Sequence, residues 1–165
     1  MPAGPGGLML HFREITPSNR AAVEALSVLP AQGGYVVGVA GSLREAASTP
    51  DAAPWYRALY DDDTPVGFVM LSDGITEENM RDPDFLGPYF LWRLLIDHRY
   101  QGRGYGAGAL ALAVAFLRSE RPDARVLLTS CGTYDSASPY GFYLRQGFQD
   151  TGTRHQGEAV LALTL

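Results

Sequence analysis

The sequence has few of the features that mark secreted, membrane-bound or metal-binding proteins. It contains a single cysteine, Cys131, and only three histidines, so it can form neither an internal disulfide nor a multi-thiolate metal site. No apolar run reaches the roughly 20 residues that a membrane-spanning helix requires. Residues 1–7 lack the basic and apolar regions of a signal peptide and read as a loose tail. We therefore expect a cytoplasmic protein without a membrane segment or a bound metal.

Positive charge is also scarce. Thirteen Lys and Arg residues stand against eighteen Asp and Glu residues, which gives a net charge of −5. Phosphate backbones are bound through summed positive charge, so this balance argues against nucleic acid as a partner. A length of 165 residues suits one domain, and we expect residues 1–165 to form a single unit.

Glycine and proline are plentiful, with 19 and 11 residues spread along the chain, which indicates short elements joined by tight turns. The patterns predict strands at 8–15, 55–60, 66–71, 88–97, 125–130, 148–153 and 158–165. They predict helices at 16–29, 34–47, 106–120 and 136–146, with an acidic loop at 72–87. The order of these elements favours a mixed α/β sheet with helices on both faces.

The segment Gln101-Gly102-Arg103-Gly104-Tyr105-Gly106 joins the central strand to the most apolar helix. Glycines at a helix N-terminus let an anion approach free N–H groups and the positive end of the helix dipole, so this loop predicts a phosphate ligand. A turn that only packs the helix on the strand is the alternative. A P-loop is excluded because no lysine is present. A dinucleotide fingerprint also lacks its acidic residue, which should follow the next strand.

Gln101, Gly104 and Gly106 match the Gln/Arg-x-x-Gly-x-Gly/Ala signature of the GNAT acetyltransferase superfamily. Residues 91–100 resemble that family's fourth strand, and residues 142–148 resemble its aromatic-Tyr-x-x-x-Gly-Phe segment. The stretches 55–71 and 147–158 are similar to the bacterial spermidine and diamine N-acetyltransferase branch. The resemblance covers residues 55–165.

The resemblance implies the GNAT fold, a mostly antiparallel sheet splayed between its fourth and fifth strands. It implies acetyl-CoA as cosubstrate, with the pantetheine arm bonded to exposed backbone of the fourth strand. The pyrophosphate would lie on the backbone of the glycine-rich loop. The residues expected to bind the coenzyme are Leu94, Ile96, Gln101, Gly102, Arg103, Gly104, Tyr105 and Gly106.

Acetyl transfer to an amine requires a base for the amine and a proton or hydrogen bond for the departing thiolate. The resemblance places Tyr143 near the coenzyme sulfur, whereas the alternative is an aromatic residue packed on the sheet. A glutamate that some polyamine acetyltransferases carry on the fourth strand is replaced by Trp92. We therefore nominate Glu158 as the base, with a solvated strand-edge charge as the alternative. Cys131 is expected to be structural.

The resemblance implies direct acetyl transfer to a primary amine of a small molecule. A polyamine is one acceptor, attracted by a negative vestibule of the acids at residues 73–84 together with Glu158. An amine antibiotic, a peptide N-terminus, and a non-catalytic acyl-CoA-binding module are the alternatives. A homodimer is one assembly that we keep open.

Overall fold

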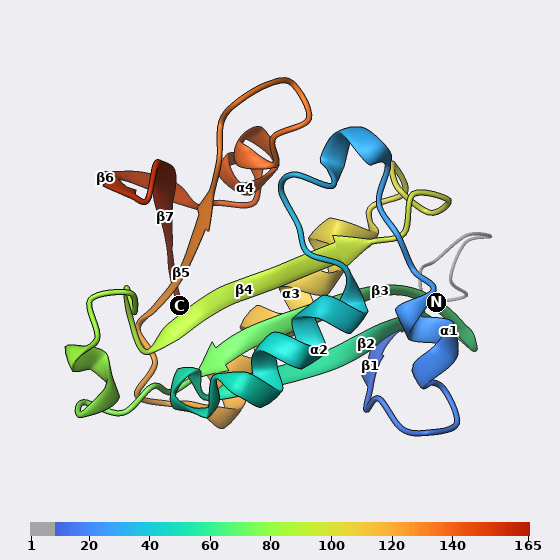
Figure 1. Cartoon of the computed structure of the whole chain (residues 1–165), viewed down its shortest axis with the longest axis horizontal. Coiled ribbons are helices and arrows are strands. Elements are labelled where there is room, and N and C mark those ends of the chain that lie inside the picture. Colours follow the sequence, from blue (N-terminus) through green and yellow to red (C-terminus); the bar gives the residue numbers. More distant parts are fainter. Residues whose placement is uncertain (1–8) are drawn as a thin grey trace, which may run out of the picture.

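A mixed sheet of seven strands organises residues 9–165, the part of the chain that the computed structural model describes. The strands run in the order β1-β2-β3-β4-β5-β7-β6 (Figure 1). Their bounds are β1 Leu10–Arg13, β2 Pro54–Asp61, β3 Thr64–Asp73, β4 Tyr89–Ile96, β5 Val126–Cys131, β6 Gln149–His155 and β7 Glu158–Thr164. The tail expected at residues 1–7, and residue 8 of the first expected strand, lie outside the described residues.

Five of the six neighbouring strand pairs are antiparallel, and only β4 and β5 run parallel. The hairpin expected at residues 55–71 is confirmed as β2 and β3, which turn at Asp62 and Asp63. The observed sheet is mixed and mostly antiparallel, as the resemblance implies. A dinucleotide-binding domain would require a mostly parallel, doubly wound sheet, so the topology excludes that alternative.

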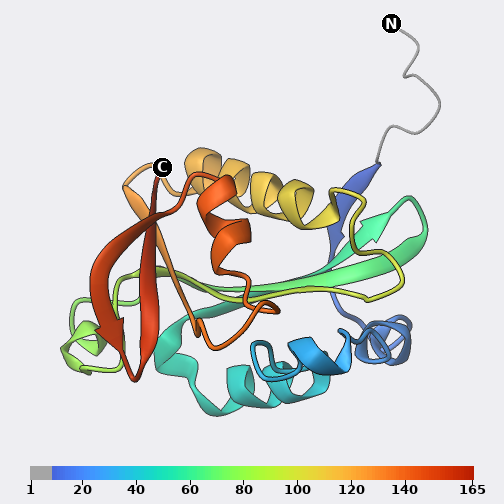
Figure 2. The same ribbon diagram turned by 90° about the horizontal axis from the view of Figure 1, so that it is seen from above.

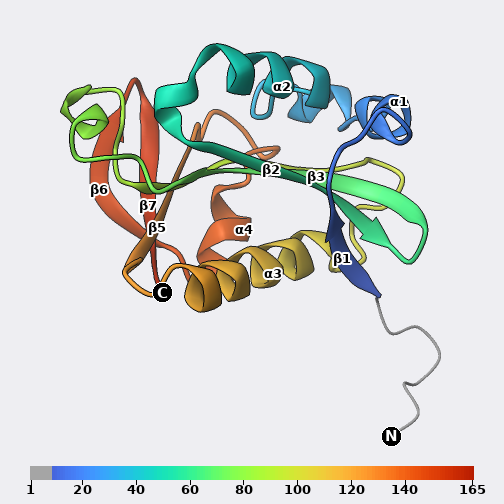
Figure 3. The same cartoon turned by 90° about the horizontal axis from the view of Figure 1, so that it is seen from below.

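Helices cover both faces of the sheet (Figures 2 and 3). Helices α1 (Arg20–Glu24) and α2 (Val39–Ser48) lie on one face, and α3 (Tyr105–Glu120) and α4 (Tyr140–Arg145) lie on the other. Three short 3₁₀ helices, η1 Pro30–Gln32, η2 Pro50–Ala52 and η3 Asn79–Arg81, lie in the connections. No helix in residues 9–165 is both long and apolar enough to cross a membrane.

Each face of the sheet has its own hydrophobic core. Strand β3 contributes side chains to both cores. Phe68 and Met70 pack toward α1 and α2, whereas Val69 and Leu71 pack toward α3. Helix α3 buries a single stripe, formed by Tyr105, Ala109, Leu110, Ala113, Val114 and Leu117. The sheet is therefore the fixed middle layer of the molecule.

Three helices are shorter than the sequence predicts. The helix expected at 16–29 is only α1, the one expected at 34–47 begins at Val39, and the one expected at 136–146 begins at Tyr140. Tertiary contacts explain the first difference. The Ser27 N–H donates to the Asp97 carboxylate at 2.9 Å, and the Ser27 carbonyl accepts the His98 N–H at 2.8 Å. The backbone N–H and carbonyl of Ser27 therefore form hydrogen bonds with residues just after β4 and are not available for a helix.

Strands β4 and β5 separate soon after they meet. They pair only at Phe90 with Leu128 and at Leu91 with Thr129. A bulge in β4 lies at this point, because Met70 and Leu71 on β3 face Arg93 and Leu91, with Trp92 between them. Beyond the bulge β4 continues to Ile96 beside β3 alone, which leaves a gap in the sheet.

Candidate active site

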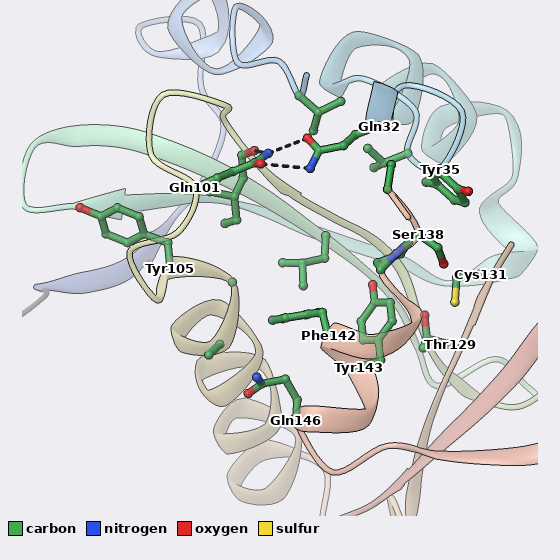
Figure 4. A pocket seen from close by; sticks show the side chains of 18 of the residues that line it. Gln32, Tyr35, Gln101, Tyr105, Thr129, Cys131, Ser138, Phe142, Tyr143 and Gln146 are labelled. Atoms are coloured by element: carbon green, nitrogen blue, oxygen red, sulfur yellow. Dashed lines mark hydrogen bonds between the residues drawn. The ribbon is translucent and has the colours of Figure 1, made fainter. Parts of the chain in front are cut away.

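A cavity of about 590 Å³ lies at the gap between β4 and β5, within the size range of small-molecule sites. Figure 4 shows it from close by. Its walls come from four parts of the chain: residues 28–36, strand β4, the glycine-rich loop with the start of α3, and the end of β5 with α4. The cavity is therefore lined from both faces of the sheet.

The edge of β4 directs backbone groups toward this cavity, and of those of Leu94 and Ile96 the Ile96 carbonyl already accepts a hydrogen bond from the Gln101 side chain. The Asp97 N–H donates to the Val66 carbonyl of β3 at 2.9 Å. Alternate residues of a strand direct their backbone groups to opposite sides, so those of Leu94 and Ile96 point toward β5. No β5 residue pairs with them. Both residues line the cavity, and their side chains pack on the core beneath α3.

The glycine-rich loop presents N–H groups at the start of α3. Gly102 and Gly104 have φ values of 75° and 85°, in the left-handed region that favours glycine. The first N–H groups of a helix have no partner within it, and within residues 9–165 no other protein group accepts the N–H groups of residues 102–107. This loop, rich in donors and without Cβ atoms at its glycines, fits a pyrophosphate.

Three of the residues expected to bind the coenzyme, Gln101, Arg103 and Tyr105, have side chains that contact other parts of the protein. The Gln101 amide donates to the Ile96 carbonyl at 3.0 Å and exchanges two hydrogen bonds with Gln32 (Figure 4). The Tyr105 hydroxyl donates to Asp61 at 2.5 Å and points away from the cavity. Arg103 does not line the cavity, and its guanidinium lies 5.9 Å from the Tyr100 ring centroid. The Gln101 side chain therefore fixes the glycine-rich loop against Ile96 and Gln32.

Tyr143 comes from α4 and is 7% exposed, with its ring directed toward β5 (Figure 4). Burial raises the pKa of its phenol above the ordinary value, the Cys131 thiol raises it further, and the Thr129 hydroxyl opposes them. The phenol is therefore protonated at neutral pH. Tyr143 also packs edge-on against Phe142 and Phe148, so it both lines the cavity and belongs to the core.

Glu158 does not line the cavity, but Ser130 does. The Ser130 hydroxyl donates to the Glu158 carboxylate at 2.8 Å. On β5, Thr129 and Cys131 are buried toward α3 and α4, so Ser130 between them faces the side of α1 and α2. The two expected catalytic residues therefore belong to opposite faces of the sheet.

Among residues 9–165, the charged residues that line the cavity are two arginines, Arg93 on β4 and Arg145 on α4, and no Asp or Glu lines it. Arg93 forms an ion pair with Glu45 of α2. None of the acids expected to form a vestibule at residues 73–84 contributes to the lining. Asp73 binds Arg121 through both carboxylate oxygens, and Asp84 borders a separate cavity of about 180 Å³. Within residues 9–165 no three side chains form a metal-binding group.

Two loops meet across one side of the cavity. The Tyr35 hydroxyl donates to the Asp135 carboxylate at 2.8 Å and accepts the Asp135 N–H at 3.0 Å. The Tyr35 ring also stacks on Tyr134, with 5.7 Å between ring centroids. Sequence reasoning missed Gln32, Tyr35 and Ser130, because each acts through a partner distant in the chain and no local motif marks it.

Residues 35–148, more than half of the chain, match the Acetyltransferase (GNAT) family. The chain belongs to the GNAT family. It is therefore an N-acetyltransferase that uses acetyl-CoA, as the glycine-rich loop and the residues around Tyr143 led us to expect. A search among curated proteins finds no match.

Solved structures agree with this acetyltransferase in fold. A GNAT-family acetyltransferase from Listeria monocytogenes is 12% identical with a TM-score of 0.68, covering 97% of each chain. An aminoglycoside acetyltransferase solved with coenzyme A is 16% identical with a TM-score of 0.68, covering 94% of each. The spermidine N-acetyltransferase of Vibrio cholerae, solved with CoA and spermine, is 12% identical with a TM-score of 0.63, covering 95% of each. At these identities the likeness shows the fold alone, so the spermidine branch is not established.

Proposed function

We propose that this acetyltransferase transfers acetyl directly from acetyl-CoA to the primary amine of a small molecule. One observation carries the proposal: a single cavity is lined from both faces of the sheet through the gap between β4 and β5. On the side of α3 and α4 it meets free backbone donors suited to the coenzyme. On the side of α1 and α2 it has a separate wall for an acceptor. Two substrates can thus meet in the gap.

Direct transfer is also supported by the high pKa of the Cys131 thiol. Burial raises the pKa of its thiol to about 11, helped by the nearby charges of Glu158 and Asp150 and opposed by a hydrogen bond from Ser138. A thiol with that pKa is almost entirely protonated at neutral pH, and only the thiolate is a good nucleophile. An acyl-cysteine intermediate is therefore disfavoured, which agrees with a structural role for Cys131.

On the coenzyme side, the thioester supplies the acetyl group and the chain's own residues orient it. In this proposal the backbone of Leu94 and Ile96 binds the pantetheine amides. The N–H groups of residues 102–106 bind the pyrophosphate, and Gln101 fixes their loop against Ile96 and Gln32. Tyr143 donates a hydrogen bond to the thiolate as it forms.

Two of the acceptor classes named from the sequence, a polyamine and an amine antibiotic, have counterparts among the solved structures. A polyamine is favoured by the spermine-bound relative from Vibrio cholerae, and an amine antibiotic by the aminoglycoside acetyltransferase. The cavity lining within residues 9–165 holds no carboxylate, which weakens the argument for a polycation. Glu45 is paired with Arg93, and Glu158 lies behind the lining with its carboxylate hydrogen-bonded to Ser130. The cytoplasmic location and the homodimer stay predictions.

The test is a panel of amines with acetyl-CoA, comprising spermidine, a simple alkylamine, an aminoglycoside and a peptide with a free N-terminus. We expect release of free thiol with at least one amine, together with a mass increase of one acetyl group on that amine. Isothermal titration should show CoA binding without acceptor and no competition from NAD. CoA binding without acetylation of any amine would instead support the non-catalytic acyl-CoA-binding module.

A further inference from the structure

The nominated base and the cavity are separated by one hydroxyl group. Glu158 does not line the cavity, whereas Ser130 does, and 2.8 Å separates the Ser130 Oγ from the Glu158 Oε2. An amine bound in the cavity therefore meets Ser130 before it can meet the carboxylate. This arrangement raises the question of how a proton leaves the amine.

The sheet register fixes the contact between these two side chains. Ser130 on β5 pairs with Val160 on β7, and Glu158 lies two residues before Val160. Residues at such diagonal positions point to the same face of a sheet and lie within reach of each other. Both strands are held by neighbours, since Cys131 pairs with Ala159 and both are buried. The hydrogen bond is thus set by the central sheet rather than by a loop.

Several charged and titratable groups surround Glu158. Across the gap on β4 stands Arg93, whose pKa is lowered by burial and raised by Glu45 and by Glu158. The thiol of Cys131 lies beneath on β5, and on β6 His155 pairs with Glu158. The Arg93 guanidinium therefore lies in the field of two carboxylates, Glu45 of α2 and Glu158 of β7.

We propose that Ser130 is a catalytic residue that relays the proton of the acceptor ammonium to Glu158. The proposal rests on the proposed acetylation of an amine. It changes the role assigned to Glu158 from the sequence, because the carboxylate then acts through the serine and does not touch the substrate. We call the pair Ser130 and Glu158 the relay.

The relay gives a balanced reaction. The ammonium gives one proton to the Ser130 oxygen while the serine's own proton moves to the Glu158 carboxylate, which later releases it to water. The neutral amine then forms a C–N bond with the thioester carbon. As the C–S bond breaks, its electron pair goes to sulfur, where Tyr143 donates a hydrogen bond, and the second proton of the nitrogen ends on the thiolate. The products are an amide, CoA thiol and one released proton.

Other lining hydroxyls are less suited to this step. Thr129 donates to the Leu91 carbonyl at 3.0 Å, and Ser138 donates to the Gly132 carbonyl at 2.6 Å. Tyr35 does donate to a carboxylate, that of Asp135, but both lie where two loops meet rather than on the strands that bound the gap. Tyr35→Phe therefore provides a control that removes a hydroxyl–carboxylate pair elsewhere in the cavity wall.

The experiment compares Ser130→Ala, Ser130→Thr, Glu158→Gln and the double variant Ser130→Ala with Glu158→Gln. The readout is kcat/KM for the best amine of the panel as a function of pH. We expect Ser130→Ala and Glu158→Gln each to lose roughly 10²-fold near neutral pH, the lower end of what a positioned acid or base contributes. The loss should shrink as the pH approaches the amine's pKa of about 10, where the free amine no longer needs a base.

Two further results would separate a relay from a structural effect. The double variant should lose no more activity than either single one, since both remove the same step. Ser130→Thr keeps a hydroxyl and should recover most of the activity, with CoA affinity unchanged in every variant. Tyr35→Phe should keep the wild-type shape of the pH profile, whatever it does to acceptor affinity.

Each contrary result has a distinct meaning. If Ser130→Ala acetylates the amine with the wild-type pH profile, the relay is wrong and direct transfer still stands. A Tyr35→Phe profile with the shape expected for Ser130→Ala would overturn the relay in favour of Asp135. If Ser130→Ala does not fold, as judged by circular dichroism, Glu158→Gln and Ser130→Thr carry the test alone. Failure of the wild-type protein to acetylate any amine would overturn the proposed function and with it the relay.

Discussion

Burial decides what Tyr143 can do for the leaving thiolate. Its pKa lies above the ordinary phenol value, because burial disfavours the charged phenolate. An ordinary thiol has a pKa of about 8.5, so complete proton transfer from the phenol to the thiolate would run uphill. A strong hydrogen bond that stabilises the developing charge is the role that fits a buried neutral phenol.

Tyr143→Phe removes this hydroxyl and little else. We expect turnover to fall by roughly ten- to thousand-fold, the range for loss of one positioned donor or acid. CoA affinity should stay near that of the wild type, because the ring that packs on Phe142 and Phe148 is retained. Steady-state kinetics and isothermal titration measure the two quantities separately.

A matched control lies three residues earlier on the same helix. The Tyr140 hydroxyl donates to Asp150 at 2.9 Å, and Tyr140 does not line the large cavity. Tyr140→Phe should therefore leave turnover unchanged. Equal turnover for Tyr143→Phe and wild type would show that Tyr143 is only a packing residue, as the alternative interpretation of the sequence has it.

Single residues show where sequence reasoning is strong and where it stops. Glycines at a strand-to-helix junction have a local physical reason, and Gly102, Gly104 and Gly106 all line the cavity. Glu158 illustrates the limit. Its nomination required a carboxylate near the amine, but only the β5–β7 register reveals that Ser130, to which Glu158 is hydrogen-bonded, lines the cavity in its place.

At the scale of elements, the start of α3 is the best place to test pyrophosphate binding. Gly104 is the N-cap and has a positive φ, so a valine there would strain the backbone as well as fill the space. Ala107 is already helical, lies in the first turn and lines the cavity. A change at Ala107 can therefore alter charge without a backbone penalty.

Ala107→Asp should weaken CoA binding while it preserves the helix. A carboxylate in the first turn is favourable to the helix dipole by about 0.3–1 kcal/mol, yet it repels a phosphate group bound at the same N–H groups. We expect at least a tenfold loss of CoA affinity, which is about 1.4 kcal/mol. Isothermal titration gives the affinity, and a thermal melt reports whether the fold is intact.

Ala107→Asn is the matched control, because asparagine has nearly the same size and no charge. It should bind CoA more tightly than Ala107→Asp does, and the difference should narrow as added salt screens the repulsion. Indistinguishable affinities for the two variants would show that the phosphates lie elsewhere.

Helix lengths were harder to predict than strand positions, for a physical reason. The pattern at residues 16–29 is helical by propensity, but the chain leaves the helix at Ala25 because Leu26 packs on the sheet and Ser27 binds Asp97. Those contacts span some 70 residues of chain. The bounds of β2 to β4 were predicted to within about two residues. Their apolar runs are a local feature of the sequence, because a strand covered on both faces is apolar along its length.

For the whole molecule, the gap in the sheet is what brings two substrates together. Tyr143 and the glycine-rich loop belong to the side of α3 and α4, while Ser130, Glu158 and Arg93 belong to the side of α1 and α2. A protein with a net charge of −5 keeps two arginines and no acid in the lining of this cavity. Of the two, Arg145 lies on the side of α3 and α4, where its positive charge suits an anionic coenzyme.

One carboxylate connects the layers beside this gap. Asp97 is 1% exposed and accepts hydrogen bonds from the Ser27 N–H, the Arg99 N–H and the Arg99 guanidinium at 2.9, 3.0 and 2.8 Å. Burial alone would raise its pKa, but these hydrogen bonds outweigh it and lower the pKa to about 2. Asp97 thereby joins the segment after α1 to the turn that leads into the glycine-rich loop.

Asp97→Asn should lower the free energy of unfolding at neutral pH by about 2.5 kcal/mol, because the carboxyl has a pKa of about 3.9 in the unfolded chain and about 2 in the folded one, and each pKa unit is about 1.4 kcal/mol. Because the folded pKa is the lower one, this contribution is complete above about pH 4 and is lost as the pH falls toward 2. Urea unfolding across this range should therefore show the wild type and variant converging at low pH. The control is Asp123→Asn, which should have the same free energy of unfolding as the wild type at every pH. Asp123 is exposed and makes no hydrogen bond or ion pair within residues 9–165. A constant difference between Asp97→Asn and the wild type at every pH would show that Asp97 stabilises the fold through packing and not through its charge.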